Sequence, residues 1–429
     1  MVDLLSKLRS LEKDIKVAII GTGSAGKGLV YQCSITPGID CLAISDIKIN
    51  KAIEAATLAG REYRVVDNLN DLHDTIRKGL LAVSEDGALL AQCESMDALI
   101  ESSNAIEEGG RYAITAIENS KHVIMMNSEA DLIFGPYLMH LANEHNVVYT
   151  SCDGDQPTVI IRLIHELRLW GFELVLAGNI KGFLDRYTNP TKIIPEADKR
   201  FLDYKMCSSY TDGTKLCVEM ALVANALGLE TDVPGMHGPR AEHILDSLEL
   251  FDLERLQRSG KKVVDYVIGP EPKGGVFAIG YCENKYQQSM LNWFPNRMGK
   301  GPFYVFWRPY HLIHIEALQC IADAVLDGNA VLQPSAGLKT NVYCYAKRNI
   351  SKGEKLDGLG GYNCYGLIEN CADNSKRSGV PICLAENVSI KRDIAKDEKI
   401  YMDDIEYNPE RFSFRLYDMA VKKSEEIRQ

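Results

Sequence analysis

Three glycines follow a short apolar run near the start of the chain, and their spacing can hold a phosphate group. The run 17–20 suits a buried strand, and Gly21, Gly23 and Gly26 follow it in the pattern G-x-G-x-x-G. The first glycine of such a pattern allows a tight turn, the second lets a pyrophosphate approach the backbone, and the third permits close helix packing. A helix that begins directly after Gly23 would direct its free N–H groups at the same phosphate. The stretch therefore predicts a dinucleotide site.

An aspartate lies where the ribose of such a dinucleotide would be. The second apolar run, 41–45, ends at Asp46, which lies 20 residues after Gly26. A carboxylate at this position accepts hydrogen bonds from the ribose hydroxyls of NAD and repels the 2′-phosphate of NADP. We therefore expect NAD as the cofactor, with NADP left open because Lys48 lies nearby. Asp46 could instead only cap the next helix.

Four further residues are expected to contact the cofactor. Ser24 and Ala25 form the start of the helix that follows the glycines. Asn104 and Asn127 each come after a predicted strand, and the carboxyl ends of parallel strands face the nicotinamide half of a dinucleotide.

A lysine is the first candidate for catalysis. Lys181 follows the predicted strand 173–177 in a turn between Gly178 and Gly182. An ammonium group at the end of a strand can donate a proton to a substrate carbonyl or polarise it. The alternative is a surface lysine in a loop. We predict that Lys181 is a catalytic residue.

A predicted helix further along carries Lys215, Glu219 and Asn225. Lys215 and Glu219 lie four residues apart, so an ordinary ion pair along the helix would also explain them. Asn225 stands in an apolar stretch, where its amide needs either a backbone group or a ligand as partner. We assign Glu219 a catalytic role, and Lys215 and Asn225 a role in substrate binding.

Positive charge in this acidic chain could bind an anionic substrate. Arg240, Lys300 and Arg308 are the candidates, because guanidinium and ammonium groups pair with phosphate or carboxylate. Arg308 could alternatively connect structural elements together with Tyr310. The titratable His237 lies near Arg240, and we predict a catalytic role for it.

The turn CDGDQP adds two carboxylates. Asp153 and Asp155 are candidates for binding substrate hydroxyls or a divalent metal such as Mg²⁺ or Mn²⁺. No spacing in the sequence specifies them as metal ligands, so the identity of any metal ligand stays unknown.

The elements that must position these residues begin with a regular alternation of predicted strands and helices, here called the strand and helix rhythm. This rhythm predicts a doubly wound parallel sheet of the Rossmann type over residues 1–152, with the polar segment 61–79 as an insertion. Residues 153–335 are predicted to form an α+β substrate and dimerisation domain, in which 210–215 make a hairpin or a strand-to-helix turn. A small β-rich module over 336–429 follows, and its segments 342–358 and 388–400 have a similar cadence typical of two related β-hairpins.

Composition excludes several classes of function. A chain of 429 residues suggests two or three domains, and its net charge of −11 without a basic run argues against nucleic-acid binding. No apolar run of membrane-spanning length occurs, and the 12 cysteines include no CxxC pair. We expect a soluble cytoplasmic protein with reduced cysteines and no zinc site.

Several long motifs together resemble one family over nearly the whole chain. They are KVAIIGTGSAGKG, KHVIMMNSEADLIFGPYL, CDGDQP, GTKLCVEMALVANALGL, PGMHGPRA, GKGPFYVFWRPYHL and KGEKLDGLGGYNCYG. The chain resembles the homoserine-dehydrogenase-like NAD(P)-dependent oxidoreductases with a C-terminal SAF domain, which has a β-clip-like fold, and within them the 1-deoxy-D-xylulose 5-phosphate reductoisomerase-like group. The resemblance implies hydride transfer to or from a small polar, sugar-derived substrate, with phosphorylation of that substrate and coupled isomerisation left open, in a homo-oligomer.

Two departures from the true homoserine dehydrogenases count against homoserine as the substrate. Those enzymes have an Asn-Lys pair where this chain reads Asn127-Ser128, and their Gly-Thr turn is replaced by the segment 178–182. Reductoisomerase-like members share a lysine at the position of Lys181, although those that prefer NADPH would carry basic residues where Asp46 stands. Homoserine dehydrogenase activity stays an alternative. A non-catalytic NAD-binding regulatory or assembly protein is the alternative from another class.

Overall fold

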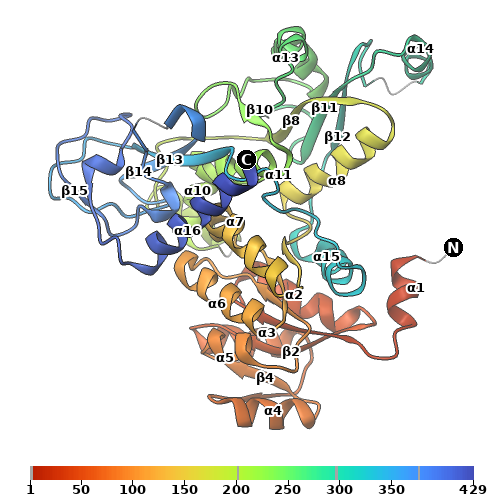
Figure 1. The fold of residues 1–429 in the computed structure, drawn as a ribbon, viewed down its shortest axis with the longest axis vertical. Coiled ribbons are helices and arrows are strands. Elements are labelled where there is room, and N and C mark those ends of the chain that lie inside the picture. The colour runs from red at the N-terminus through yellow and green to blue at the C-terminus, as the bar shows by residue number, and fades with distance from the viewer. Residues whose placement is uncertain (1–2, 201, 295–297, 375–376) are drawn as a thin grey trace. The chain divides into compact units, whose positions relative to one another are not determined.

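The computed structural model describes residues 3–200, 202–294, 298–374 and 377–429 of the chain (Figure 1). Its contacts divide the chain into two units. Unit 1 consists of residues 1–155, 312–333 and 415–426, and unit 2 of residues 156–311, 334–414 and 427–429. The expected division into three domains at residues 152 and 335 stays a prediction.

A parallel sheet of seven strands forms the centre of unit 1, with the order β3-β4-β2-β1-β5-β6-β7. Its strands are β1 (Ile15–Ile20), β2 (Ile39–Ser45), β3 (Tyr63–Val65), β4 (Leu81–Ser84), β5 (Ala98–Glu101), β6 (His122–Met125) and β7 (Tyr149–Ser151). The chain leaves β1 toward β2 and later returns to β5 on the other side. This reversal of direction marks the crevice in which doubly wound sheets bind ligands. The predicted α/β fold with a Rossmann-type sheet is confirmed.

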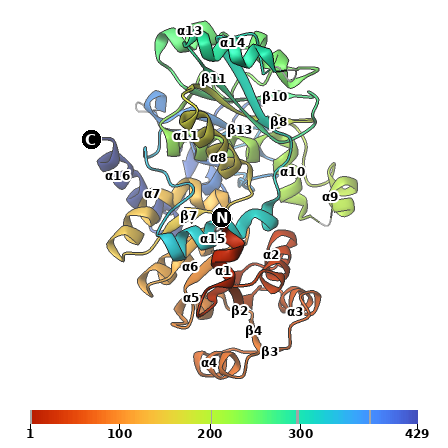
Figure 2. The ribbon, with the colours of Figure 1, turned by 90° about the vertical axis from the view of Figure 1, so that its right-hand side faces the viewer.

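Helices cover this sheet. They are α1 (Leu4–Arg9), α2 (Ser24–Ile35), α3 (Ile49–Leu58), α4 (Leu69–Arg77), α5 (Gly87–Gln92), α6 (Ile106–Glu118), α7 (Ser128–Glu144), α15 (Ile313–Asp327) and the part of α16 (Phe412–Arg428) that belongs to unit 1. The apolar faces of α2, α3 and α15 share one core with the sheet. Figure 2 shows α15 beside α1 and α2, and Gly28 of α2 allows the close approach, because a Cβ there would lie 2.4 Å from the ring of His314.

The segment 61–79 is part of the sheet, so its prediction as an insertion was wrong. β3 pairs with β4 in parallel, and α4 buries Leu72 and Thr75. β3 is short and lies at the edge of the sheet, where Tyr63 and Val65 are exposed. An exposed edge strand lacks the continuous apolar run of a buried strand, which explains why the pattern was missed.

A mixed sheet of five strands organises unit 2, with the order β12-β11-β8-β10-β9. Its strands are β8 (Glu173–Lys181), β9 (Glu230–Thr231), β10 (Val263–Ile268), β11 (Val276–Tyr281) and β12 (Phe303–Arg308). β8 is parallel to β10 and antiparallel to β11. The ends of β8, β10 and β12 and the start of β11 therefore lie side by side. They form the edge of the sheet that runs across the strand ends, which is the edge meant below.

The helices of unit 2 include α8 (Gln156–Leu169), α9 (Ile194–Arg200), α10 (Tyr204–Asp212), α11 (Thr214–Leu227), α12 (Ser247–Leu250), α13 (Leu253–Ser259) and α14 (Lys285–Trp293). The segment 210–215 joins α10 to α11, so the predicted hairpin or strand-to-helix turn was wrong. Gly213 separates the two helices with a φ of +86°, a conformation that other residues rarely adopt. One glycine therefore turns a helical stretch into two helices.

The last part of unit 2 is rich in short strands: β13 (Thr340–Ala346), β14 (Cys364–Asn370), β15 (Ser389–Ile390) and β16 (Ile405–Glu406). The similar segments 342–358 and 388–400 pair with each other, so the predicted hairpins are wrong, whereas the predicted relation between the two segments is seen. Ile350 and Ile394 exchange both backbone hydrogen bonds at 2.9 Å. Both segments also carry the same ion pair, Arg348–Glu354 at 2.5 Å and Arg392–Glu398 at 2.7 Å. The sequence similarity thus corresponds to a structural duplication.

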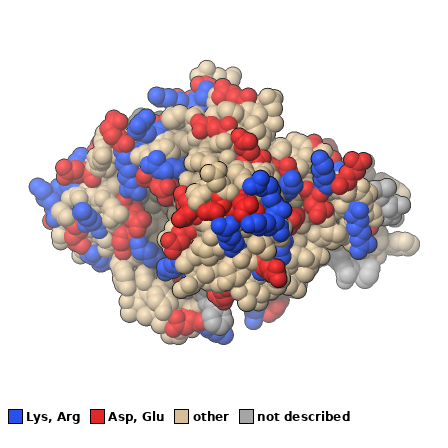
Figure 3. All heavy atoms as spheres, turned by 90° about the horizontal axis from the view of Figure 1, so that it is seen from below, with Lys and Arg blue, Asp and Glu red and all other residues tan. Residues whose placement is uncertain are grey.

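Charge is mixed on the face that Figure 3 shows, where acidic and basic side chains alternate over short distances. All twelve cysteines are free thiols, and all except Cys371 are buried. Among the helices that the structure describes, none is long and apolar enough to span a bilayer.

Candidate active site

The glycine turn of unit 1 has the geometry of a phosphate-binding loop. Gly21 has a φ of +86°, and a Cβ on it would lie 2.6 Å from the backbone nitrogen of Ser103. A Cβ on Gly26 would lie 1.8 Å from the carbonyl oxygen of Gly21. By contrast, a Cβ on Gly23 would have no atom within 4 Å. The first and third glycines are thus required by the fold, and the second leaves open space before the first turn of α2.

Asp46 holds the neighbouring loop in place. Its Oδ2 accepts hydrogen bonds from the backbone nitrogen of Thr22 at 2.9 Å and from Thr22 Oγ1 at 3.3 Å, and its Oδ1 accepts from the Lys48 nitrogen at 2.9 Å. A carboxylate has about four lone-pair sites, so it can still accept from a ribose hydroxyl. The aspartate at the end of β2 is thus tied directly to the residue between the first two glycines.

The other predicted cofactor residues lie around the same end of the sheet. Ser24 is exposed and Ala25 half-buried in the first turn of α2, and Asn104 is exposed after β5. Asn127 is buried and caps α7, where its Oδ1 accepts from the Ala130 nitrogen at 3.1 Å and its Nδ2 donates to the Ala105 carbonyl at 3.2 Å. The Asn127 amide therefore holds two backbone segments, and a contact of these residues with a cofactor stays a prediction.

Glu101, which sequence reasoning missed, is buried at the end of β5. Its Oε1 accepts a hydrogen bond of 3.0 Å from the Ser103 nitrogen, and Oε2 has no hydrogen-bond partner among the described residues. Burial raises the pKa of Glu101 to about 7. Burial likewise raises the pKa of Asp131 to about 6, although Tyr149 donates to it at 2.6 Å. The one available signal was an acidic residue closing an otherwise apolar strand.

The catalytic candidates Lys181 and Glu219 meet in unit 2. Lys181 is the last residue of β8, so the strand runs four residues further than predicted. Its Nζ lies 3.0 Å from Oε1 of Gln156, at the start of α8, and 3.5 Å from Oε2 of Glu219 on α11. The Lys181 side chain is 16% exposed and that of Glu219 is 5% exposed, so this ammonium lies in a largely desolvated, polar surrounding.

Two further polar side chains join this cluster. Asn179 lies on the same face of β8 as Lys181, and its Nδ2 donates to Oε1 of Gln156 and, at 3.4 Å, to Oε2 of Glu219. Nε2 of Gln156 lies 3.1 Å from Nε2 of His311. Gln156, Asn179 and His311 were not predicted, although Gln156 was part of the quoted CDGDQP motif. We call Gln156, Asn179, Lys181, Glu219 and His311 the lysine cluster.

Of the remaining predicted substrate residues of the helix and the acidic turn, all except Asp155 are buried. Lys215 is buried on α11, and Asn225 is used by the chain itself: its Oδ1 accepts from the Thr340 nitrogen at 2.9 Å and its Nδ2 donates to the Thr340 carbonyl at 3.1 Å. A backbone partner therefore accounts for the Asn225 amide. Asp153 is buried and Asp155 half-buried in unit 1.

His237 lies in a separate group of charges. Its Nε2 is 2.8 Å from Oδ2 of Asp232, which also pairs with Arg255 at 2.5 Å. The backbone nitrogen of His237 donates to the buried carboxylate of Asp265 at 3.0 Å. No hydrogen bond or ion pair joins His237 to Lys181 in the described part of the chain. The catalytic role of His237 stays a prediction.

The pairing of the strands places two of the three candidate cations near Lys181 and the third at the other end of the strands. Arg240 lies beside Ile268, which pairs with Lys181. Arg308 ends β12 at the same edge of the sheet, with its guanidinium 4.5 Å from the centre of the Tyr310 ring. Lys300 precedes β12 and so lies toward the opposite edge. Arg240 and Arg308 thus flank the edge that carries Lys181, and Lys300 does not.

No group of three or more His, Cys, Asp or Glu side chains that could hold a metal ion occurs among the described residues. The metal requirement stays untested.

A family model matches the part of the chain that contains the lysine cluster. Residues 154–317, which contain the whole lysine cluster, match the family described as oxidoreductase DRL, catalytic domain. The protein is an oxidoreductase. This match decides against the alternative of a non-catalytic binding protein.

Several solved structures are similar to the chain. The chain is similar to a structure titled as a probable dehydrogenase from Thermotoga maritima, with 13% identity over 74% of this chain and 90% of that one and a TM-score of 0.40. It is also similar to apo scyllo-inositol dehydrogenase from Lactobacillus casei, with 12% identity over 75% of this chain and 90% of that one and a TM-score of 0.39. A third similar structure is myo-inositol dehydrogenase from Lactobacillus casei in complex with NAD(H) and myo-inositol. Its identity is 20% over 44% of this chain and 53% of that one, and the TM-score is 0.28. None of the curated protein sequences matches the chain.

Proposed function

We propose that this oxidoreductase uses a nicotinamide dinucleotide, with a preference for NAD, and acts on the carbonyl or hydroxyl group of a small polar metabolite. The observation that carries the proposal is the lysine cluster, in which a largely buried Lys181 is held by Gln156 and Glu219 within the matched catalytic segment. Such an arrangement provides a positioned proton donor next to a carboxylate.

The residues of unit 1 fit the cofactor. Open space at Gly23 lies where a pyrophosphate would approach the first turn of α2, whose free N–H groups favour an anion. Asp46 follows β2 and can accept from ribose hydroxyls, and its charge opposes a 2′-phosphate. A bound nicotinamide supplies or accepts the hydride in this chemistry. These features support NAD over NADP.

Lys181 would hold the proton that the substrate oxygen needs. When a carbonyl is reduced, its oxygen gains negative charge, and an ammonium beside it stabilises that charge and donates the proton. Glu219 pairs with the same nitrogen at 3.5 Å, so its carboxylate helps to hold the lysine side chain in place. Gln156 fixes the direction of the ammonium through its Oε1, and His311 fixes Gln156 in turn.

The substrate we propose is anionic and sugar-derived, in keeping with the family resemblance. Arg240 and Arg308 flank the edge of the sheet that carries Lys181, so they are the cations we propose for its phosphate or carboxylate group. A reductoisomerase-like reaction would couple reduction to isomerisation. The departures from the homoserine dehydrogenases at Ser128 and at 178–182 favour this substrate class over homoserine.

Three features of the wider protein belong to the same proposal. We propose that residues 1–152 form the nucleotide-binding domain, residues 153–335 the substrate domain and residues 336–429 the SAF-like domain. We also propose that the protein is a homo-oligomer in the cytoplasm. The duplication within residues 342–400 supports treating the last segment as a separate module.

A panel assay tests the function. Purified protein is mixed with NADH or NADPH and with sugar phosphates, tetronates or aspartate semialdehyde, and in the reverse direction with NAD and homoserine. We expect cofactor oxidation with a sugar-derived anion and a lower KM for NADH than for NADPH. Turnover of homoserine alone would overturn the proposed substrate class, and tight NADH binding with no turnover on any member of a broad panel would overturn the proposed substrates altogether.

A further inference from the structure

A cavity of about 300 Å³ lies in unit 2, outside the lysine cluster. Leu184, Leu216, Ile268 and Leu367 form much of its wall, and they come from four separate parts of the chain. None of the five residues of the lysine cluster lines it. A volume of this size is at the lower end of the range for small-molecule sites, so an occupant would be small.

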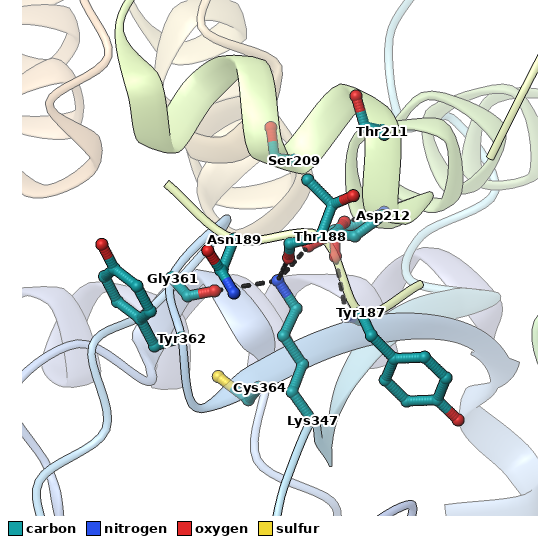
Figure 4. A network of polar contacts seen from close by, with 12 residues as sticks. Tyr187, Thr188, Asn189, Ser209, Thr211, Asp212, Lys347, Gly361, Tyr362 and Cys364 are labelled. Atoms are coloured by element: carbon teal, nitrogen blue, oxygen red, sulfur yellow. Dashed lines mark hydrogen bonds and ion pairs between the residues drawn. The ribbon is translucent and has the colours of Figure 1, made fainter. Parts of the chain in front are cut away.

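One of the residues that line this cavity belongs to a buried ion pair. Asp212, one of the lining residues, lies 2.7 Å from Nζ of Lys347, and both side chains are almost fully buried. Figure 4 shows the Lys347 ammonium between Asp212 and the carbonyl groups of Thr188 and Gly361, to which it donates at 2.7 and 2.8 Å. The charge of Asp212 is therefore offset within the protein by Lys347.

Arg186 provides a charge that the protein does not offset in this way. It lines the cavity and is exposed, and its guanidinium lies 5.2 Å from the centre of the Tyr365 ring. Tyr365 is itself held, because its hydroxyl donates to Asp397 at 2.9 Å. Within the described residues, Arg186 takes part in no ion pair. A planar guanidinium fixed against a ring is suited to binding a carboxylate with two hydrogen bonds.

The carboxylates near Arg186 make their hydrogen bonds with other groups, so its guanidinium is the group that can attract an anion. Asp397 accepts hydrogen bonds from both Tyr187 and Tyr365, and Lys396 lies 3.7 Å from the centre of the Tyr187 ring. Asp185 accepts from the backbone nitrogen of Tyr187 at 3.1 Å and from Thr188 Oγ1 at 3.0 Å. Asp185 and Asp397 are thus hydrogen-bonded within the protein.

We propose that this cavity is a second ligand site, separate from the lysine cluster, and that it binds a small organic carboxylate with an apolar body. The apolar body would fill the space between the four aliphatic side chains, and the carboxylate would pair with Arg186 at the exposed side. The ligand would also contact Leu216 in the first turn of α11, the helix that carries Glu219.

Binding of benzoate to the full-length protein, measured by calorimetry, tests the site, with benzamide as the neutral probe of the same shape. We expect benzoate to bind more tightly than benzamide. Arg186→Gln should weaken benzoate binding about tenfold or more, as expected for the loss of a charged hydrogen-bonded pair. Arg258→Gln removes another exposed arginine and should leave binding unchanged.

Two further variants locate the probe. Leu216→Trp fills the cavity and should abolish binding, with circular dichroism as the check that the variant is folded. Lys181→Met should bind benzoate as the wild type does, because the lysine cluster does not line the cavity. The proposal is overturned if benzoate does not bind, if Arg186→Gln binds it normally, or if Lys181→Met loses it. Because no step of this test needs turnover, its outcome is independent of the proposed substrate.

Discussion

Nζ of Lys181 lies 3.0 Å from Oε1 of Gln156, which is 25 residues earlier in the chain. The strand β8 thus contacts the first turn of α8 through this oxygen, which also accepts a hydrogen bond from Asn179, and the amide has a fixed orientation because His311 contacts its other end. Gln156 therefore acts as a positioning residue for the lysine. Replacing Gln156 should therefore impair proton transfer by Lys181 although the lysine itself is still present.

Gln156→Leu should lower kcat about tenfold or more with little change in KM. The leucine removes the amide oxygen that lies 3.0 Å from Nζ of Lys181, so the ammonium loses its fixed direction, while the cations proposed for the substrate are untouched. The measurement is kcat and KM with a substrate from the panel, with circular dichroism as the check that the variant is folded. An unchanged kcat in the folded variant would contradict the assignment.

Asp46→Asn should shift the cofactor preference. The amide keeps much of the shape but loses the charge that binds ribose hydroxyls and repels a 2′-phosphate. We expect NADH to bind about tenfold or more weakly, in line with the loss of a charged hydrogen bond, and NADPH to bind at least as well as before. Fluorescence titration of both cofactors measures this. Equal weakening of both would argue against a role in discrimination.

Gly23→Ala and Gly26→Ala form a matched pair. Gly23 has a φ of −64° and open space around a Cβ, so its alanine variant should keep the wild-type melting temperature and lose NADH binding. In Gly26→Ala the new Cβ would lie 1.8 Å from the Gly21 carbonyl oxygen, so the turn must distort and the melting temperature should fall. Calorimetry and cofactor titration separate the two effects. Normal NADH binding by Gly23→Ala would contradict the proposed phosphate site.

The buried carboxyl of Glu101 should make unfolding depend on pH. Its pKa is about 7 in the folded protein against an ordinary value of 4.5, so the native state binds more protons than the unfolded state between these pH values. Stability attributable to this group is therefore present below pH 4.5 and falls by about 3 kcal/mol as the pH rises through 7. Glu101→Gln should remove this share of the pH dependence and stabilise the protein at pH 8.

Urea unfolding of the wild type and Glu101→Gln at pH 5 and 8 measures this difference. Asp131, with a pKa of about 6, contributes in the same direction and is unchanged in the variant, so some pH dependence should remain. An identical pH dependence in both proteins would mean that Glu101 titrates normally.

The sequence was most informative where function depends on residues that are close in the chain. The glycine turn, the strand before it and Asp46 form one local unit, and a buried parallel strand has an apolar pattern that is easy to recognise. Lys181 was found for the same reason, since it ends a predicted strand next to glycine.

The parts that were missed depend on distant contacts. Nothing near Gln156 indicates that its amide will meet Lys181, and the pairing of Asn225 with Thr340 joins residues 115 positions apart. The edge strand β3 lacked an apolar run, and the break between α10 and α11 depends on the left-handed conformation of Gly213. Patterns of single residues do not encode such long-range partners.

Lys181→Met tests the central claim most directly, with Lys199→Met as the control because Lys199 is an exposed lysine of α9. Both variants are titrated with NADH and then assayed for NADH oxidation with a substrate that the wild type turns over. We predict that Lys181→Met binds NADH normally and loses a factor of about 10² to 10⁴ in kcat, as for removal of a general acid, and that Lys199→Met behaves as the wild type. Wild-type kcat in Lys181→Met would contradict the account.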